Sequence, residues 1–328
     1  MPTPPDAAPA GAEDNRGHRF FLQPLRHTKT LYLIRHGEGF HNLYGEKDRS
    51  AYRSERYADA HLTPLGWNQC AALRSHLESA TTHDGKDALL DRIELVVVSP
   101  LMRALETAVG ALGGDHLPAT PEIQTGTQTG AGNGVGNGAA TPPPLMRATT
   151  PEDGVRPGHP AVAPRATRTR APLPFLACEL CREHIGLNPC DRRRDTSIYR
   201  DAFPGVDFSE VTDEKDILWG TMNESNEAMC ERAHRFMEWV MRRPEQHVAV
   251  VTHSAFMAAM LREFGATDQL GCSPEVKAET HRWPNNCEMR PVVVVDPSGG
   301  GGLDPMFFPG GEEGMKWAEK AREARRVY

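Results

Sequence analysis

Short runs of apolar residues that stop at polar side chains constrain the fold of this chain more than any other feature. The first run covers residues 31–34 and is followed by Arg35-His36-Gly37. We interpret it as a buried strand, and Gly37 allows a sharp turn at its end, where open α/β sheets hold their ligands. Imidazole is a competent nucleophile near neutral pH, and a guanidinium can bind two phosphate oxygens in a planar fork. Arg35 and His36 are therefore candidates for phosphoryl chemistry.

Two further apolar runs end in residues that could bind phosphate. Residues 93–98 stop at a Ser-Pro pair, after which a helix begins with Arg103 in its first turn. The unpaired N–H groups at a helix start attract anions. Residues 247–252 end at His253. Because the carboxyl ends of neighbouring parallel strands meet at one edge of a sheet, we expect His36 and His253 to lie together if their strands are neighbours.

A fourth segment offers a proton donor. Residues 174–180 form a short apolar run that leads into a cluster of carboxylates and bases. Phosphoryl transfer needs a proton for the departing oxygen, and burial in a cleft can raise the pKa of a glutamate until it holds one near neutral pH. Glu183 is the candidate acid, and Glu179 is the alternative.

Candidate substrate ligands lie close in sequence to this acid and to the strand expected at 247–252. The basic run Arg192-Arg193-Arg194 is either a solvated loop or the mouth of the pocket, where it would recruit a second anionic group of the substrate. On the second interpretation Arg193 and Arg194 bind substrate. Ser254, which directly follows the strand-end histidine, is a further candidate ligand.

Taken in order, these motifs resemble those of the histidine phosphatase superfamily, also called the phosphoglycerate-mutase-like family. The match begins at Arg35-His36-Gly37-Glu38, with Asn42 six residues after the histidine. The resemblance implies that His36 is transiently phosphorylated and that Asn42 contacts substrate or phosphate. It also places Arg35, Arg103 and His253 in the phosphate pocket and Glu183 near the proton donor. Residues 181–194 look like a eukaryotic branch of the family known from plants and fungi.

The order of expected elements predicts an α/β fold. Strands are expected at 30–34, 93–98, 174–180, 247–252 and 287–295, and helices at 64–79, 101–111, 224–242 and 255–264. Alternating strands and helices predict a three-layer sandwich, with a mainly parallel central sheet flanked by helices, as in phosphoglycerate-mutase-like proteins.

One catalytic domain is expected over residues 29–296. Residues 1–28 are interpreted as a disordered leader and 297–328 as a tail that ends in a short helix. The Gly- and Pro-rich stretch from about 113 to 172 is expected to be a disordered insertion, because such a composition buries too little apolar area to offset the entropy of ordering.

Composition excludes several other classes of function. The 328 residues carry a formal net charge of −7, which argues against nucleic acid as a partner. No apolar run approaches the roughly 18 residues that span a bilayer, and the N-terminus lacks the apolar stretch of a secretory signal. Seven cysteines, an odd number, fit a reducing compartment. We expect a cytoplasmic protein without membrane contact, and the sequence does not predict its oligomeric state.

The resulting hypothesis is a phosphatase that hydrolyses small phosphate monoesters through a phosphohistidine on His36. No metal or cofactor is expected, because cationic side chains supply the charge that a magnesium ion would otherwise provide. A phosphoglycerate-type mutase is the second interpretation; the stretch between Glu183 and His253 is short for the cap that would retain a bisphosphate intermediate. A non-catalytic protein that binds a phosphorylated ligand is the third.

Overall fold

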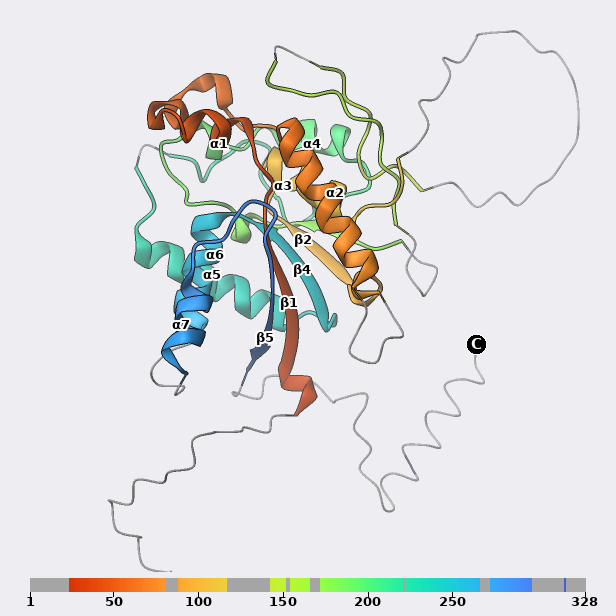
Figure 1. Ribbon diagram of the computed structural model, residues 1–328, viewed down its shortest axis with the longest axis vertical. Helices are drawn as coiled ribbons and strands as arrows, with labels where there is room; N and C mark the ends of the chain where they lie inside the picture. The colour runs from red at the N-terminus through yellow and green to blue at the C-terminus, as the bar shows by residue number, and fades with distance from the viewer. Residues whose placement is uncertain are drawn as a thin grey trace, which may run out of the picture.

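Five strands form one central sheet in the computed structural model, which describes residues 24–80, 88–116, 142–151, 154–165, 172–220, 222–265, 272–296 and 316. Their order across the sheet is β3-β2-β4-β1-β5. Figure 1 labels β2, β4, β1 and β5 in this order. The pairs of β1 with β4, β4 with β2 and β2 with β3 are parallel, and β5 joins β1 antiparallel at the edge. The bounds are β1 (Thr28–Arg35), β2 (Leu95–Val98), β3 (Phe175–Ala177), β4 (His247–Thr252) and β5 (Met289–Val295).

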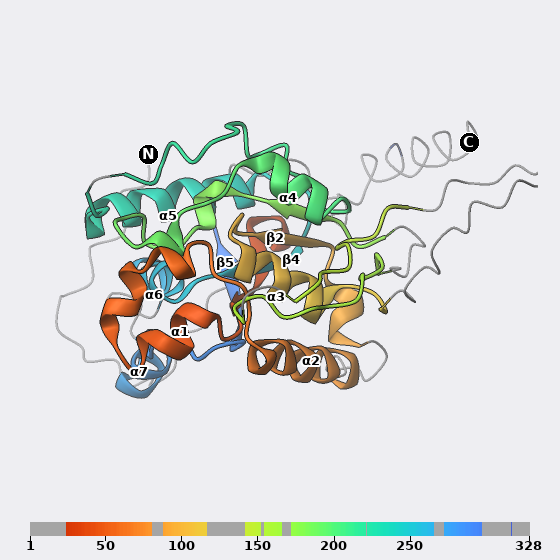
Figure 2. The same cartoon turned by 90° about the horizontal axis from the view of Figure 1, so that it is seen from above.

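Helices cover both faces of this sheet, which confirms the predicted α/β sandwich. Figure 2 shows α2 and α5 on opposite sides of the strands. The helices are α1 (Phe40–Gly45), α2 (Pro64–Ser79), α3 (Met102–Leu112), α4 (Thr196–Ala202), α5 (Asn226–Met241), α6 (Ser254–Phe264) and α7 (Pro274–His281). Among the described residues, no helix is both long enough and apolar enough to cross a membrane.

Alternate side chains of β1 pack into different core clusters on the two faces of the sheet. Leu31 and Leu33 pack into the cluster that contains Phe236 of α5, whereas Ile34 packs with Leu77 of α2. Successive side chains of a strand point to opposite faces, so a strand covered on both sides must be apolar throughout. This is why the apolar runs of the sequence located the strands.

The third and fifth strands differ from their expected bounds. The predicted strand at 174–180 is shortened to β3, because the chain turns into the 3₁₀ helix η5 (Glu179–Cys181) two residues later. The strand predicted at 287–295 begins at Met289, after Cys287 takes a positive φ of 55°. Both changes lie at loops that border the site described below.

Close backbone packing fixes the start of α2 against the loop that follows β1. The Thr63 hydroxyl accepts a hydrogen bond from the N–H of Gly66 and thereby caps the helix. A Cβ atom added at Gly66 would lie 2.2 Å from the carbonyl oxygen of Glu38. Only glycine permits this approach, which holds the residues after His36 against the helix.

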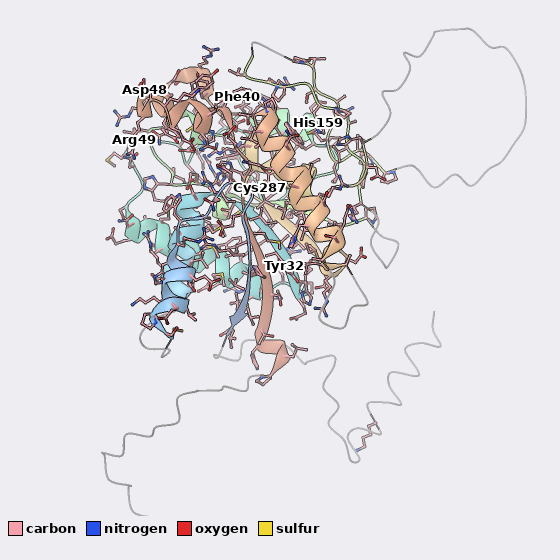
Figure 3. The ribbon with its side chains drawn as sticks, viewed as in Figure 1. Tyr32, Phe40, Asp48, Arg49, His159 and Cys287 are labelled. Atoms are coloured by element: carbon pink, nitrogen blue, oxygen red, sulfur yellow. The ribbon has the colours of Figure 1, made fainter. Side chains whose placement is uncertain are left out.

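Part of the expected insertion is ordered, contrary to the prediction. Leu145, Met146 and Val162 are buried in the core cluster beside α3. The N–H of Val162 donates to the carbonyl oxygen of Met146 at 3.0 Å. The ring of His159, which Figure 3 labels, stacks on Trp67 of α2 with centroids 3.7 Å apart. These apolar and aromatic residues supply the burial that the surrounding Gly and Pro lack. The Gly-rich run at 132–138, the leader up to residue 23 and the expected tail helix lie outside the described residues.

Candidate active site

The loop after β1 carries His36 into the interior, where its side chain is almost completely buried. Its N–H donates to the carbonyl oxygen of Thr252 on β4, and its own carbonyl oxygen accepts from the N–H of Cys287 and from Nδ2 of Asn286. The next residue, Gly37, donates its N–H to Oγ1 of Thr107 on α3 at 2.9 Å. Contacts from β4, α3 and the segment before β5 therefore fix the backbone of His36.

The two ring nitrogens of His36 have partners that define its tautomer. Nδ1 lies 2.7 Å from the carbonyl oxygen of Gly37, which can only accept. Nε of Arg103, which can only donate, lies 3.3 Å from Nε2. The ring is therefore neutral, with its proton on Nδ1 and a lone pair on Nε2. Burial holds the pKa of His36 well below its ordinary value, and the charges of Arg103 and Arg35 act in the same direction.

Arg103 extends from the first turn of α3 and is fully buried. Nη1 donates to the carbonyl oxygen of Cys190 at 2.5 Å, and Nη2 lies 2.6 Å from Oδ1 of Asp191. Burial disfavours the charge on Arg103, but the Asp191 carboxylate and other acidic groups nearby outweigh burial and raise its pKa. The guanidinium is therefore a fixed positive charge beside His36.

His253 directly follows β4 and meets His36 as the topology predicts, with ring centroids 5.0 Å apart. Its Nε2 lies 2.7 Å from the hydroxyl of Ser99, at the end of β2. Burial, together with Arg103, holds the pKa of His253 well below its ordinary value. Within the described residues its buried Nδ1 has no hydrogen-bond partner.

Arg35 ends β1, and its guanidinium contacts the segment that precedes β5. Nη1 donates to the carbonyl oxygen of Pro284 at 2.9 Å, whereas the buried Nε has no hydrogen-bond partner in the part of the chain described. Burial lowers the pKa of Arg35 and the nearby Glu183 carboxylate opposes this change. A partly buried cation with a buried, unused donor is suited to an anionic ligand.

Glu183 lies at the N-terminus of α6, close to these arginines. Oε1 accepts from the N–H of His184 at 2.9 Å and from the N–H of Ala255 at 3.1 Å, and Oε2 accepts from the Ser254 hydroxyl at 3.3 Å. Burial raises the pKa of Glu183, and the charge of Asp191 adds to this effect. Together they outweigh the hydrogen bond from His184, so the carboxyl group can hold a proton at a higher pH than an exposed glutamate.

Glu179, the alternative acid, takes part in two ion pairs. Its carboxylate lies 3.1 Å from Nη1 of Arg182 and 2.7 Å from Nε of Arg193. Arg193 itself is buried and donates to the backbone carbonyl oxygens of residues 213–215. This placement differs from the expected position at a pocket mouth. A buried guanidinium must satisfy its donors internally, and here it ties the 213–215 loop to Glu179.

The remaining predicted ligands make local contacts. Oδ1 of Asn42 accepts from the N–H of Gly39 and closes the start of α1. Ser254 donates to Glu183, as described above. The side chain of Arg194 is half-exposed, and its Nε lies 3.2 Å from Oδ2 of the buried Asp59. Asn42 thus fixes the start of α1, Ser254 contacts the candidate acid Glu183, and Arg194 has a carboxylate partner.

Sequence reasoning missed several residues that hold this site together. Asp191 fixes Arg103, Ser99 pairs with His253, and the ring of His41 lies 5.5 Å from that of His36. Burial and the two site arginines hold the pKa of His41 well below its ordinary value. Ser99 could have been found from its place at the carboxyl end of a strand. Asp191, the partner of Arg103, lies 88 residues further along the chain, and no local pattern links the two residues.

Fold and site together define a class of α/β protein in which a neutral, buried histidine lies at the carboxyl edge of the sheet, among arginines and a second histidine. The model of the histidine phosphatase superfamily, branch 1, matches residues 31–125 and 205–273. A phosphoglycerate mutase-like protein of Arabidopsis thaliana is 40% identical over 284 residues, which cover 86% of this chain and 90% of the relative. The chain belongs to the histidine phosphatase superfamily.

Other similar proteins carry mutase-like and phosphatase names. Phosphoglycerate mutase-like protein 1 of Arabidopsis thaliana is 38% identical over 284 residues, covering 84% of this chain and 85% of the relative. Among solved structures, the ecdysone phosphate phosphatase from Bombix mori, in complex with tungstate, is 14% identical. It covers 85% of this chain and 98% of its own, with a TM-score of 0.43.

Proposed function

We propose that this protein is a phosphatase that hydrolyses phosphate monoesters through a phosphohistidine intermediate on His36. The observation that carries the proposal is the environment of Nε2 of His36. A lone pair on a neutral ring faces a fixed guanidinium. Nε of Arg35 and Nδ1 of His253, two ring or guanidinium nitrogens without a partner among the described residues, belong to the same cluster. A phosphoryl group bound there would be placed beside the nucleophile and would offer oxygens to those donors.

In the first step Nε2 of His36 attacks phosphorus and the bond to the leaving alcohol breaks. Negative charge on the phosphoryl oxygens is stabilised by Arg35, Arg103 and His253. The raised pKa of Glu183 supports its role as the acid that protonates the alcohol. Glu179 is the weaker candidate, because its two carboxylate oxygens are already engaged by Arg182 and Arg193.

In the second step water attacks the phosphohistidine and returns His36 to its neutral form. Glu183, now ionised, takes a proton from that water. Asn42 and Ser254 are proposed to support the site, Asn42 by closing the start of α1 and Ser254 by holding Glu183. Each positioned donor contributes about 3 kcal/mol to a step of this kind, so removing one would slow turnover by about a hundredfold or more.

The test measures phosphate release from sugar phosphates, phosphoglycerates, nucleotides and an aryl phosphate, with EDTA present. His36→Ala is compared with the wild type and with His234→Ala, which alters an exposed histidine on α5. We expect release by the wild type and by His234→Ala, and none by His36→Ala.

Two other outcomes would contradict the proposal. Isomerisation of a phosphorylated substrate without released phosphate, dependent on a bisphosphate primer, would assign a mutase. Binding of inorganic phosphate with no turnover of any substrate would assign a ligand-binding protein.

A further inference from the structure

Two thiols from distant parts of the chain meet beside the loop that carries His36. Cys70 of α2 and Cys287, which precedes β5, have Sγ atoms 3.7 Å apart, and both are free thiols. Cys70 is fully buried, whereas Cys287 is partly exposed. Figure 3 labels Cys287 at the end of the sheet where the candidate site lies. A disulfide has an S–S distance of about 2.05 Å, so the two sulfur atoms would have to approach by about 1.6 Å to form one.

The segment that contains Cys287 holds the backbone of the candidate site. The N–H of Cys287 donates to the carbonyl oxygen of His36 at 3.2 Å, and Nδ2 of Asn286 donates to the same oxygen at 3.1 Å. The carbonyl oxygen of Pro284 accepts from Nη1 of Arg35 at 2.9 Å. A displacement of this segment would therefore disturb the candidate nucleophile and one of its arginines together.

Cys70 has less freedom to move than Cys287. A Cβ atom added at Gly110 of α3 would lie 3.0 Å from the Cβ atom of Cys70, so the two helices are in close contact at this position. Cys287 lies in the loop between α7 and β5 and has a φ of 55°, a conformation that costs energy for a residue with a side chain. Closing the gap between the sulfur atoms should therefore move Cys287 and leave α2 in place.

We propose that Cys70 and Cys287 form a reversible disulfide and that this bond lowers turnover at His36. The disulfide shifts the N–H of Cys287 that donates to the carbonyl oxygen of His36. Because a misplacement of about 1 Å can slow a catalysed reaction about a hundredfold, activity is reduced for as long as the bond persists. The effect on turnover rests on the proposed function, whereas formation of the bond does not.

The proposed oxidant is a peroxide, and the reaction begins at the more exposed thiol. The thiolate of Cys287 attacks a peroxide oxygen, the O–O bond breaks and hydroxide leaves, which gives a sulfenic acid. Sγ of Cys70 then attacks the sulfenic sulfur, the S–S bond forms, and the thiol proton leaves with the hydroxyl group as water. The two thiols lose two electrons, and hydrogen peroxide is reduced to two molecules of water. A dithiol reverses the change by thiol–disulfide exchange.

The order of these steps follows from the surroundings of the two sulfur atoms. The hydrogen bond with Cys287, together with burial, raises the pKa of Cys70 well above its ordinary value, which protects Cys70 from direct oxidation. A second pair of neighbouring cysteines differs in exposure. Cys178 and Cys181 are both buried, and Sγ of Cys181 donates to the carbonyl oxygen of Cys178 at 3.2 Å. Neither thiol of that pair is open to an oxidant.

The first measurement follows the bond itself on the full chain. The protein is reduced with dithiothreitol, desalted and exposed to hydrogen peroxide, and the remaining thiols are alkylated before digestion without reductant. Mass spectrometry should detect the peptide that contains Cys70 linked to the peptide that contains Cys287, with loss of two of the seven thiols per chain. Dithiothreitol should remove the link, and no linked peptide should form in Cys70→Ala.

The second measurement follows phosphate release from an aryl phosphate by the same samples. The rate of the oxidised wild type should be about a hundredfold below that of the reduced wild type, and dithiothreitol should restore it. Each variant is compared with its own reduced rate, so that an effect of the substitution on basal activity cancels. Cys287→Ser and Cys70→Ala should retain their reduced rates after peroxide. The control Cys230→Ser, at a partly exposed cysteine of α5, should respond as the wild type does.

The outcomes separate the two claims. Absence of the link between Cys70 and Cys287, or a link that leaves His36-dependent turnover unchanged, overturns this inference alone. A loss of activity that is equal in Cys287→Ser and wild type does the same. Absence of His36-dependent turnover in the reduced protein overturns the proposed function and the effect on turnover with it, while mass spectrometry still decides whether the bond forms.

Discussion

Nε of Arg103 lies 3.3 Å from Nε2 of His36, while the far end of the same guanidinium lies 2.6 Å from Asp191. An N–H donor at Nε2 is compatible only with a lone pair there, so Arg103 both orients the ring and disfavours its protonation. Asp191 keeps Arg103 in that position. Asp191 thus acts on the candidate nucleophile His36 indirectly, by holding Arg103 of α3 against it.

Replacing this carboxylate should change both rate and pH dependence. In Asp191→Asn the guanidinium loses its ion pair, and the resulting misplacement should lower kcat/KM by about a hundredfold. The charge of Asp191 also raises the pKa of Glu183. Without it, the descending limb of kcat/KM at high pH, where Glu183 loses its proton, should move to lower pH. A pH–rate profile with an aryl phosphate measures both effects.

The control for this variant is Asp195→Asn, at an exposed residue that precedes α4 and makes no capping hydrogen bond. It should leave the profile unchanged. A descending limb that stays in place in Asp191→Asn would contradict the assignment of Glu183 as the acid.

Stability should fall as the pH is lowered, because His36, His41 and His253 all have pKa values held below their ordinary value. The unfolded chain takes up protons on these histidines near pH 6.5, whereas the folded protein does not. The unfolded state therefore binds more protons below that pH. The free energy of unfolding is therefore highest above about pH 6.5. Below that pH each histidine lowers it by up to about 1.4 kcal/mol per pH unit.

Urea unfolding between about pH 7.5 and about pH 5 tests this dependence. His41→Asn should reduce the slope of the unfolding free energy against pH by the contribution of His41, about one third of the contribution of the three histidines. The exposed His234→Asn should leave the slope unchanged. A slope equal in wild type and His41→Asn would show that His41 is protonated in the folded protein.

The ordered part of the insertion should contribute to stability. Leu145 is buried beside α3, and truncating a buried leucine costs about 2–5 kcal/mol. Leu145→Ala is therefore expected to lower the free energy of unfolding by an amount in this range, measured by urea titration. Leu187→Ala, at an exposed leucine, serves as the control. An unchanged unfolding free energy in Leu145→Ala would mean that residues 142–165 do not pack on the domain in solution.

The close approach of α2 to the loop after His36 should tolerate no side chain. In Gly66→Ala the new Cβ would displace the carbonyl oxygen of Glu38, and overpacking of this kind costs about 1–3 kcal/mol. Activity should fall as well, because Glu38 lies two residues from His36. Gly220→Ala is the matched control, since a Cβ there meets nothing closer than 4.0 Å. Thermal unfolding and phosphate release on both variants test the expectation; equal behaviour would contradict it.

The sequence predicted the sheet and the residues at its carboxyl edge because both depend on local patterns. An apolar run buried on two faces marks a strand, and the residue that ends it must lie at the edge. This reasoning brought His36 and His253 together although more than 200 residues separate them. It also located the helix that carries Arg103.

Features set by long-range packing could not be predicted in the same way. Arg193 and Arg194 are neighbours in one basic run, yet the first is buried against Glu179 and the second is half-exposed. Nothing in the run distinguishes them. Similarly, Leu145 and Val162 lie in a Gly- and Pro-rich region, and they are buried because they pack in the same cluster as the apolar residues of α3.

The central claim is that His36 itself carries the phosphoryl group. The most direct measurement mixes the enzyme with an aryl phosphate, quenches the reaction in base within milliseconds and maps the phosphorylated peptide by mass spectrometry. We predict phosphorylation of the peptide that contains His36, at Nε2, appearing and decaying at rates that match phosphate release, and absent from His36→Ala. Phosphate release that proceeds in His36→Ala, or a phosphoryl group on any other residue, would contradict the mechanism.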